Sequence, residues 1–312
     1  MNKCFICYQR LEEGLQEFHP ACAKKLFGVN QAPVIDFEMS QLEELAHQII
    51  SKSKAVTGVQ PKLSLNLKKS KNEPSRLTLV GLHGDYILIP PSFEFKELPQ
   101  NEDLTMHLAE QVKIKTAMHG LIRLKSGELA YITNRFDRNK GEKIAVEDFC
   151  QLSENLTEHK HRGSIEKVGK VAQSFTTNKG FEAQRLFELV LFCFLTGNAD
   201  MHLKNFSLIE NSFGEYEFST AYYLLNTSLV MPEDKEESAL TINGKTSKLN
   251  RNDFNALANS LKINEKSLDA IFHRFNEILP NWIAWIEQSF LSDSFKDDFI
   301  QSVSKKHNRL FS

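Results

Sequence analysis

Asp200, Lys204 and Asn205 lie close together directly after a Gly-Asn pair. The run before that pair, residues 186–195, is almost entirely apolar and predicts a buried helix that the Gly-Asn turn ends. Phosphoryl transfer uses an aspartate to orient the substrate hydroxyl, a lysine near the transferred phosphate and an asparagine oxygen for Mg²⁺. The segment therefore predicts a phosphoryl-transfer loop. The alternative is an ordinary polar turn, since Asp and Asn favour turns in any case.

The spacing Asp-x-x-x-x-Asn is that of a protein-kinase catalytic loop. Other segments resemble, in the same order, those of the HipA family of toxin kinases. They are a glycine-rich loop at 58–64, a strand at 86–91, the first helix at 101–106, segments around the hinge at 135–138 and 147–151, and a metal loop at 221–227. The resemblance covers residues 50–230 approximately. It implies an α+β, bilobal protein-kinase-like fold with a β-rich small lobe and a helical large lobe.

The resemblance also implies roles for individual residues. Asp200 and Lys204 would be catalytic, Asn205 would bind Mg²⁺, and the ATP contacts would come from Gly58, Lys62, Glu102, Glu147, Phe149 and His202. Thr57, directly before Gly58, stands at the position of a serine that is autophosphorylated in that family, so the resemblance implies Thr57 as the autophosphorylation site. A β-branched residue also suits a strand, which is the alternative interpretation of Thr57.

Two residues depart from the family pattern where the chemistry depends on it most. The strand lysine that would pair with the α- and β-phosphates is Ile89, and the metal-loop aspartate is Tyr223. Lys62 on the glycine-rich loop could replace the strand lysine, as happens in the WNK kinases. Glu102, which orients that lysine in kinases, would then pair with Lys62 or would simply be a first-turn acid favoured by the helix dipole.

Four further residues with metal-ligand chemistry lie near the N-terminus. Cys4 and Cys7 form a Cys-x-x-Cys pair, and His19 and Cys22 follow at the start of a predicted helix. Such a set could complete a tetrahedral Zn²⁺ site in a segment too short to have its own core. The alternative is a group of reduced cysteines packed against the small lobe. The family's full-length members carry a larger N-terminal subdomain, so this chain resembles the short, HipT-like form.

Hydrophobic periodicity places these residues on elements. We predict strands at 77–80, 86–89, 121–124 and 129–133, and helices at 41–50, from Glu102 to about 116, and from Ser164 as its cap to about 174. Further helices are expected at about 180–196, 251–260, 265–279 and 282–307. The expected organisation is an N-terminal extension (1–50), a small lobe (51–146) and a large lobe (147–312).

Composition narrows the class of protein. The 312 residues suit two lobes sharing a cleft, and a net charge of −2 gives no overall attraction to nucleic acid. Five cysteines and the lack of a long apolar run favour a cytoplasmic protein without membrane contact. The resemblance implies small antitoxin proteins as partners, including a helix-turn-helix antitoxin that would supply DNA binding. An aminoacyl-tRNA synthetase is the family's usual sort of substrate.

Three functions fit these observations. The first is a kinase-fold toxin-antitoxin protein whose catalysis is impaired by Ile89 and Tyr223, a pseudokinase. The second is an active serine/threonine kinase that uses Lys62, Asp200 and Asn205 with ATP and Mg²⁺. The third is a zinc-bearing interaction module. We favour the first, because losing the carboxylate that joins metal to phosphate removes a large electrostatic contribution to the rate.

Overall fold

The computed structural model describes residues 2–42, 44, 62–70, 73–80, 84–92, 94–139 and 142–312. The chain forms two compact units, and each is described by itself below. Unit 1 comprises Met1–Asp103 and Ala117–Gly141, and unit 2 comprises Leu104–Thr116 and Glu142–Ser312. Thr57, Gly58 and most of the helix expected at 41–50 lie outside the described residues.

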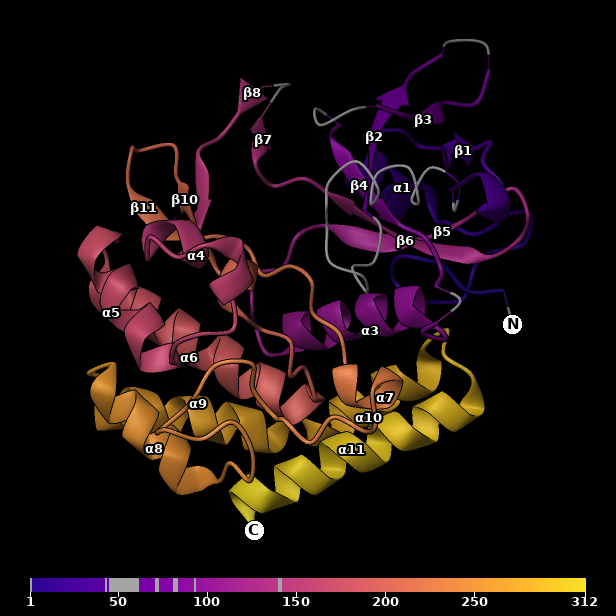
Figure 1. Ribbon diagram of the computed structural model, residues 1–312. Coiled ribbons are helices and arrows are strands. Elements are labelled where there is room, and N and C mark those ends of the chain that lie inside the picture. Colours follow the sequence, from indigo (N-terminus) through magenta and orange to yellow (C-terminus); the bar gives the residue numbers. More distant parts are fainter. Residues whose placement is uncertain are drawn as a thin grey trace. The chain divides into compact units, whose positions relative to one another are not determined.

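Unit 1 is built on a six-stranded sheet with the strand order β1-β3-β2-β4-β6-β5 (Figure 1). Its strands are β1 (Val34–Ile35), β2 (Leu63–Lys68), β3 (Arg76–Leu79), β4 (Tyr86–Ile89), β5 (His119–Arg123) and β6 (Leu129–Asn134). All neighbours are antiparallel except β1 and β3. Strands β3, β4, β5 and β6 lie within a residue or two of the four predicted strands, because each is a short apolar run bounded by turn residues.

The N-terminal segment packs on the edge strand β5 of this sheet. The backbone N–H of Leu121 donates to the carbonyl of Phe5 at 3.0 Å. Helix α1 (Pro20–Phe27) follows, with proline in its first turn and Gly28 at φ +69° as its C-cap. Its last residue, Phe27, lies 5.9 Å from the ring of Tyr86 on β4, so the segment shares the hydrophobic core of unit 1.

Helix α3 (Leu98–Gln111) carries the boundary between the units and begins earlier than predicted. Glu102 therefore lies beyond the first turn, and the first-turn explanation for this acid is wrong. Its side chain is only 2% exposed. Burying a carboxyl group costs free energy unless charged or polar groups interact with it, so we expect such groups to act on Glu102.

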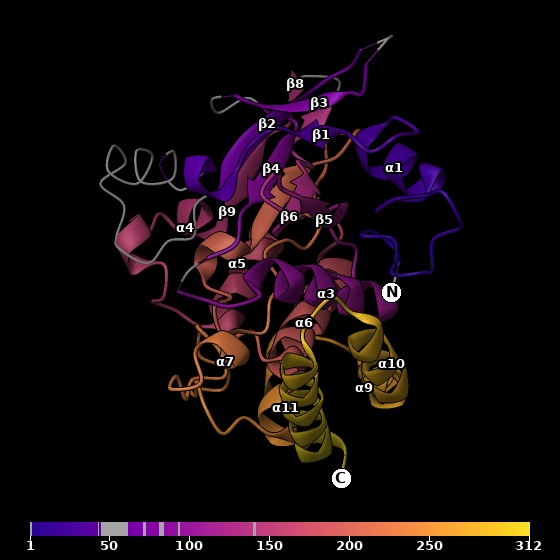
Figure 2. The ribbon, with the colours of Figure 1, turned by 90° about the vertical axis from the view of Figure 1, so that its right-hand side faces the viewer.

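Unit 2 is mainly helical. Its principal helices are α5 (Ile165–Phe175), α6 (Lys179–Thr196), α8 (Arg251–Ser260), α9 (Glu265–Glu277), α10 (Leu279–Gln288) and α11 (Asp293–Phe311). Helix α6 contacts α5, α8 and α11, and α11 runs beside α10 (Figure 2). The helix predicted at 282–307 is two helices, because Ser289 and Ser292 bound a break between α10 and α11.

Two aromatic residues near the C-terminus belong to the core of unit 2. Trp282 and Phe299 are fully buried, and the indole N–H of Trp282 donates to the carbonyl of Leu108 at 3.0 Å. Phe192 on α6 lies edge-on to Trp282 with the ring centroids 5.6 Å apart. This packing holds α6 rigidly, and α6 leads directly into the predicted catalytic loop.

Unit 2 also contains shorter elements. They are β8 (Glu142–Lys143), β9 (Val146–Asp148), α4 (Phe149–Leu152), the 3₁₀ turns η1 (Thr157–His159) and η2 (Leu203–Asn205), β10 (Ser207–Glu210), β11 (Tyr216–Phe218) and α7 (Thr227–Val230). Strands β9, β10 and β11 form an antiparallel sheet with β10 in the centre, and β7 (Arg138–Asn139) belongs to unit 1.

None of the described helices combines the length and apolar character that a membrane span requires.

Candidate functional site

The predicted catalytic loop starts where α6 ends. Gly197 adopts φ +81°, and its carbonyl accepts hydrogen bonds from the backbone N–H and the hydroxyl of Thr227, both at 3.0 Å. The Thr227 hydroxyl oxygen also accepts the N–H of Ala199 at 2.9 Å. These bonds tie the catalytic loop to the end of the predicted metal loop within unit 2.

Asp200 has a backbone carbonyl that organises the rest of the loop. It accepts the side-chain amide of Asn205 and the N–H of His202, both at 2.8 Å. The Asn205 amide group donates with Nδ2, which leaves Oδ1 as the atom that can bind a cation. Asp200 and Asn205 are thus joined within one turn of the chain, and their roles in phosphoryl transfer stay a prediction.

Lys204 is held by a residue that the sequence analysis assigned no role. Its ammonium group pairs with Oδ2 of Asp148 at 2.7 Å, and the other oxygen of Asp148 caps α4 by accepting the N–H of Gln151 at 3.0 Å. The Tyr222 hydroxyl donates to the Lys204 carbonyl at 3.1 Å. Its burial raises the pKa of Tyr222 to about 12, so it remains a donor. Asp148 was missed because an aspartate at a helix N-cap is common and does not reveal a distant lysine partner.

The backbone of the hinge residue Phe149 forms hydrogen bonds within unit 2. Phe149 donates its N–H to the Phe206 carbonyl at 3.1 Å and accepts the N–H of Ser153 at 3.1 Å. Its fully buried ring stacks on Phe218 at 5.4 Å. Both backbone groups of Phe149 thus have a hydrogen-bond partner within unit 2, and its contact with adenine stays a prediction. Glu147 lies on β9 opposite Leu208, with its side chain exposed.

Tyr223 occupies the metal-loop position in an unusual conformation. Its φ is +56°, in the left-handed region that Gly, Asn and Asp adopt more readily than a bulky residue. The neighbouring Tyr222 is anchored by a 2.5 Å hydrogen bond between its hydroxyl and that of Ser207. The backbone at position 223 therefore keeps a shape suited to aspartate, while the side chain supplies no carboxylate.

Ile89 in unit 1 is a core residue. It is 2% exposed and pairs with Tyr131 of β6 at the end of β4. Lys62 lies immediately before β2, and its charge lowers the pKa of Glu102 against a larger upward effect of burial. Burial and the neighbouring Asp103 still leave the pKa of Glu102 at about 8. The positive charge that acts on Glu102 thus comes from Lys62 rather than from position 89.

The N-terminal Cys/His residues come together as predicted for a metal site. One ligand atom from each of Cys4, Cys7, His19 and Cys22 lies within 4.8 Å of all the others. The distances from His19 Nδ1 are 3.3 Å to the Cys7 sulfur and 3.9 Å to the Cys22 sulfur. Tetrahedral Zn²⁺ with ordinary bond lengths separates such atoms by roughly 3.5–3.8 Å. The group fits a zinc ion with little movement.

The surroundings of this group of Cys4, Cys7, His19 and Cys22, called the Cys/His knuckle below, act differently on its members. His19 Nε2 lies 3.1 Å from the carbonyl of Arg10, and donation of its proton there leaves Nδ1 as the ligand. Burial opposes ionisation of the Cys4 thiol, but backbone hydrogen bonds from Cys7 and its neighbours lower the pKa overall. Burial and the Cys4 charge raise the pKa of Cys22 to about 12.

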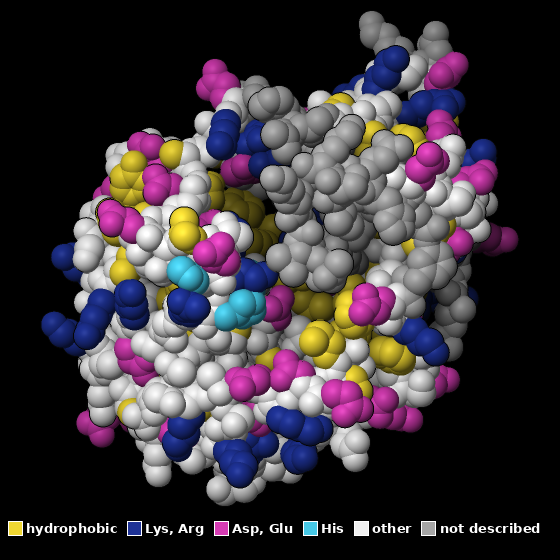
Figure 3. All heavy atoms as spheres, in the orientation of Figure 1, with side chains coloured by type: hydrophobic (Ala, Val, Ile, Leu, Met, Phe, Trp, Pro, Cys, Tyr) yellow, Lys and Arg dark blue, Asp and Glu magenta, His cyan; other side chains and the backbone are white. Residues whose placement is uncertain are grey.

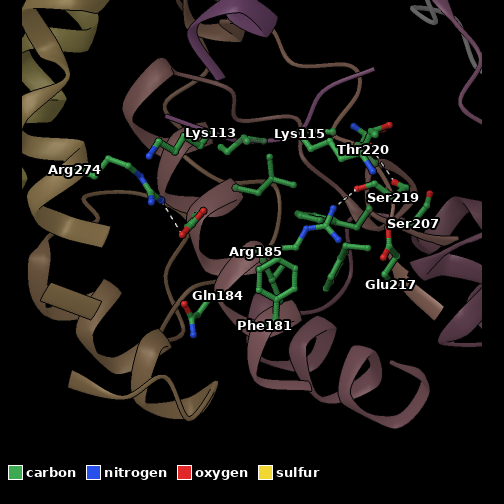
Figure 4. Close-up of a pocket in the computed structure, with 18 residues that line it drawn as sticks. Lys113, Lys115, Phe181, Gln184, Arg185, Ser207, Glu217, Ser219, Thr220 and Arg274 are labelled. Carbon is green, nitrogen blue, oxygen red and sulfur yellow. Dashed lines mark hydrogen bonds and ion pairs between the residues drawn. The ribbon is translucent and has the colours of Figure 1, made fainter. Parts of the chain in front are cut away.

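A separate cavity of about 450 Å³ lies within unit 2 (Figure 4). Of the described site residues, Asn205 lines it, whereas Asp200 and His202 do not. Figure 4 shows Arg185 pointing to the carbonyl of Ser219, a contact of 3.0 Å, and Arg274 paired with Glu188 at 2.7 Å. Both arginines are thus paired with groups of the protein itself.

Comparison with known proteins agrees with this geometry. The model of the HipA-like C-terminal domain family matches residues 54–283. A Haemophilus influenzae protein named "Putative kinase" is 28% identical over 167 residues, which are 50% of this chain and 47% of that protein. The Sinorhizobium fredii protein named "Putative kinase Y4dM" is 28% identical over 226 residues, 68% of this chain and 54% of that one. The chain thus spans about half the length of these curated relatives.

Two solved structures share the fold. The Shewanella oneidensis toxin HipA, in a complex with HipB and operator DNA, matches with a TM-score of 0.67 and 21% identity over 85% of this chain and 70% of that chain. The Helicobacter pylori proinflammatory kinase CtkA matches with a TM-score of 0.54 and 14% identity over 75% of this chain and 90% of that one. The predicted α+β kinase-like fold is confirmed.

Proposed function

Because this chain belongs to the family of HipA-like C-terminal domains, we propose that it is a kinase-fold toxin-antitoxin protein with strongly impaired phosphoryl transfer. One observation carries the proposal. Tyr223 stands, at φ +56°, on a loop whose attachments to Gly197 and Ser207 hold the catalytic loop in place. The catalytic scaffold is thus retained, while the carboxylate that would join Mg²⁺ to the phosphates is missing.

The residues of unit 2 fit a magnesium site incompletely. Bound Mg²⁺ would neutralise phosphate charge, and Asn205 Oδ1 is the ligand atom that the loop offers. Tyr223 cannot supply the second protein oxygen, and Mg²⁺ prefers carboxylates together with phosphate. Asp200 would still orient a hydroxyl and Lys204 would still be available once released from Asp148. Single electrostatic contributions of this kind are worth about 10²–10³ in rate, which sets the scale of the impairment.

A second candidate, an active kinase, is favoured by the interaction between Lys62 and Glu102. Lys62 lowers the pKa of Glu102 within unit 1 and so favours its ionised form, as a phosphate-binding lysine does for its orienting glutamate. Lys62 would then do the work of the lysine that Ile89 replaces. ATP, Mg²⁺ and a protein substrate such as an aminoacyl-tRNA synthetase belong to this candidate.

A third role, as a zinc-bearing interaction module, rests on Cys4, Cys7, His19 and Cys22 and is compatible with either catalytic state. Partnership with small antitoxin proteins, including a helix-turn-helix protein, is part of the proposal. The partnership is supported by the structural similarity to Shewanella oneidensis HipA, which was solved in a complex with HipB and operator DNA. A cytoplasmic location belongs to the same proposal.

The proposal is tested by restoring the residues of the family pattern at positions 89 and 223. Ile89→Lys with Tyr223→Asp should gain Mg²⁺-dependent transfer of labelled phosphate from ATP to the chain itself, at Thr57 or another hydroxyl, by about 10²-fold or more. The matched control, Ile89→Met with Tyr223→Phe, makes changes at both positions without adding charge. Adding Asp200→Asn to the revertant should abolish the gain.

Brisk autophosphorylation of the unaltered chain would overturn impairment and support the active candidate. Lys62→Met should then remove that activity, because no other cation would take the place of the strand lysine. A thermal-shift measurement with ATP, with and without Mg²⁺, distinguishes weak nucleotide binding from no binding. A ligand that binds the folded state raises the melting temperature.

A further inference from the structure

The segment before α5 brings a second histidine to the catalytic loop. One ligand atom each from His161, Asp200 and His202 lies within 4.8 Å of the other two, and all three residues belong to unit 2. The two imidazole rings are nearly perpendicular, at 88°, with centroids 4.9 Å apart. Aromatic packing accounts for the contact of the rings but not for a carboxylate within reach of both.

The backbone holds this group together from both sides. The N–H of Leu203 donates to the carbonyl of Lys160 at 3.0 Å, which fixes the chain at 160–161 against the residue that follows His202. The Asp200 carbonyl accepts the N–H of His202 at 2.8 Å. His202 is 6% exposed, whereas His161 is an exposed side chain. Histidine side chains reach the surface of the face shown in Figure 3, beside lysine and arginine.

We propose that His161, Asp200 and His202 form a Zn²⁺ site distinct from the Cys/His knuckle. Two imidazoles and one carboxylate are the ligands of open, three-residue transition-metal sites, which keep a coordination position for water or substrate. Mg²⁺ demands oxygen ligands, so this group does not serve the cation of ATP. Zinc bonds of about 2.0–2.2 Å place donor atoms closer together than 4.8 Å. Rotation of the exposed His161 side chain closes that gap, while His202 stays in place.

Occupancy of this site has a consequence that rests on the proposed function. Zn²⁺ would take up the carboxylate of Asp200, the group that orients the substrate hydroxyl in phosphoryl transfer. The metal-bound chain would therefore be inhibited whatever the residues at positions 89 and 223. Loss of a ligand imidazole should release the carboxylate without altering the backbone bonds to Asn205.

Binding is tested without ATP, so that it does not depend on kinase activity. Protein with its knuckle already loaded is titrated with Zn²⁺ by calorimetry, and with Co²⁺ by visible absorption. We expect one further equivalent whose cobalt spectrum lacks thiolate charge-transfer bands. His161→Ala should weaken this equivalent at least tenfold. The matched control is His159→Ala, which removes a histidine of the same segment that lies outside the group. Excess Mg²⁺ should not displace the metal.

Two results would overturn the site: a loaded protein that takes up no further equivalent, or a His161→Ala variant that titrates like the unaltered chain. The inhibitory consequence is tested in the Ile89→Lys, Tyr223→Asp revertant, where Zn²⁺ should suppress phosphoryl transfer and His161→Ala should relieve the suppression. A revertant without activity would contradict the proposed function and leave the metal titration to decide the site. Activity that Zn²⁺ does not change would contradict inhibition through Asp200.

Discussion

The hydroxyl of Tyr8 donates a 2.6 Å hydrogen bond to Oδ2 of Asp103, although 95 positions separate the two residues. Tyr8 directly follows the knuckle residue Cys7, and Asp103 directly follows Glu102 on α3. The other carboxylate oxygen of Asp103 lies 2.7 Å from Nδ1 of His119. Burial and the Asp103 charge raise the pKa of Tyr8 well above its usual value, so the hydroxyl stays protonated and donates. A buried polar network thus joins the N-terminal segment to the helix that carries Glu102.

Tyr8→Phe should lower the free energy of unfolding by about 1.5–3 kcal/mol, because it removes a buried hydrogen bond to a charged group. Chemical denaturation measures the loss. Tyr216→Phe is the control, since that side chain is 44% exposed and its change should stay within about 0.5 kcal/mol. Equal stability of the two variants would show that the Tyr8 hydroxyl contributes nothing to the fold.

The Cys/His knuckle should retain about one zinc per chain through dialysis, because four preorganised ligands bind Zn²⁺ far more tightly than three. Cys22→Ser should lose that metal and lower the melting temperature. Cys150→Ala removes a buried thiol outside the knuckle and should keep the metal. Metal analysis by mass spectrometry checks both variants. Zinc content well below one per chain in the unaltered protein would favour reduced cysteines packed in the core.

Glu102 should make the chain less stable as the pH rises. Its pKa in the folded state is about 8 against an ordinary value of 4.5, so between these values the folded chain holds a proton that the unfolded chain has released. The unfolding free energy must fall with rising pH across that window. Glu102→Gln should flatten the pH dependence of the melting temperature, and Lys62→Met should steepen it by removing the charge that lowers this pKa.

The control for this titration is Glu94→Gln, which removes an exposed carboxylate of unit 1 and should leave the pH profile unchanged. If the pH profiles of Glu102→Gln and the control coincide, Glu102 is ionised in the folded chain. Groups other than Lys62 must then offset the cost of burying its charge.

Gly197→Ala should destabilise the catalytic loop more than substitution of another left-handed glycine. A Cβ atom at position 197 would lie 2.5 Å from Oδ1 of Asn226 and 2.7 Å from the Ser228 hydroxyl. Gly127 has φ +108° and open space around it, so Gly127→Ala carries the backbone cost alone. We expect Gly197→Ala to cost about 1–3 kcal/mol more, as overpacking does. Hydrogen exchange at residues 198–205 reports the loosening directly, and equal costs for both variants would contradict a close approach of the two loops.

The sequence by itself determined the class of fold, and it predicted where a catalytic loop would lie. Alternating and helical periodicity fixed β4, α6 and α8 to within a residue, because those segments have one buried face or are buried throughout. The spacing from Asp200 to Asn205 and the Cys-x-x-Cys pair are local, so their chemistry could be recognised before any packing was known. Ile89 and Tyr223 were likewise visible as departures from a pattern.

Tertiary structure alone decided which partners these residues meet. The pairing of Lys204 with Asp148, of Tyr8 with Asp103 and of His161 with the catalytic loop joins positions tens of residues apart, and no periodicity encodes such contacts. The start of α3 and the break between α10 and α11 were also missed, because capping and packing set helix ends more than propensity does. Burial, which raises the pKa of Glu102, arises only when the whole core has formed.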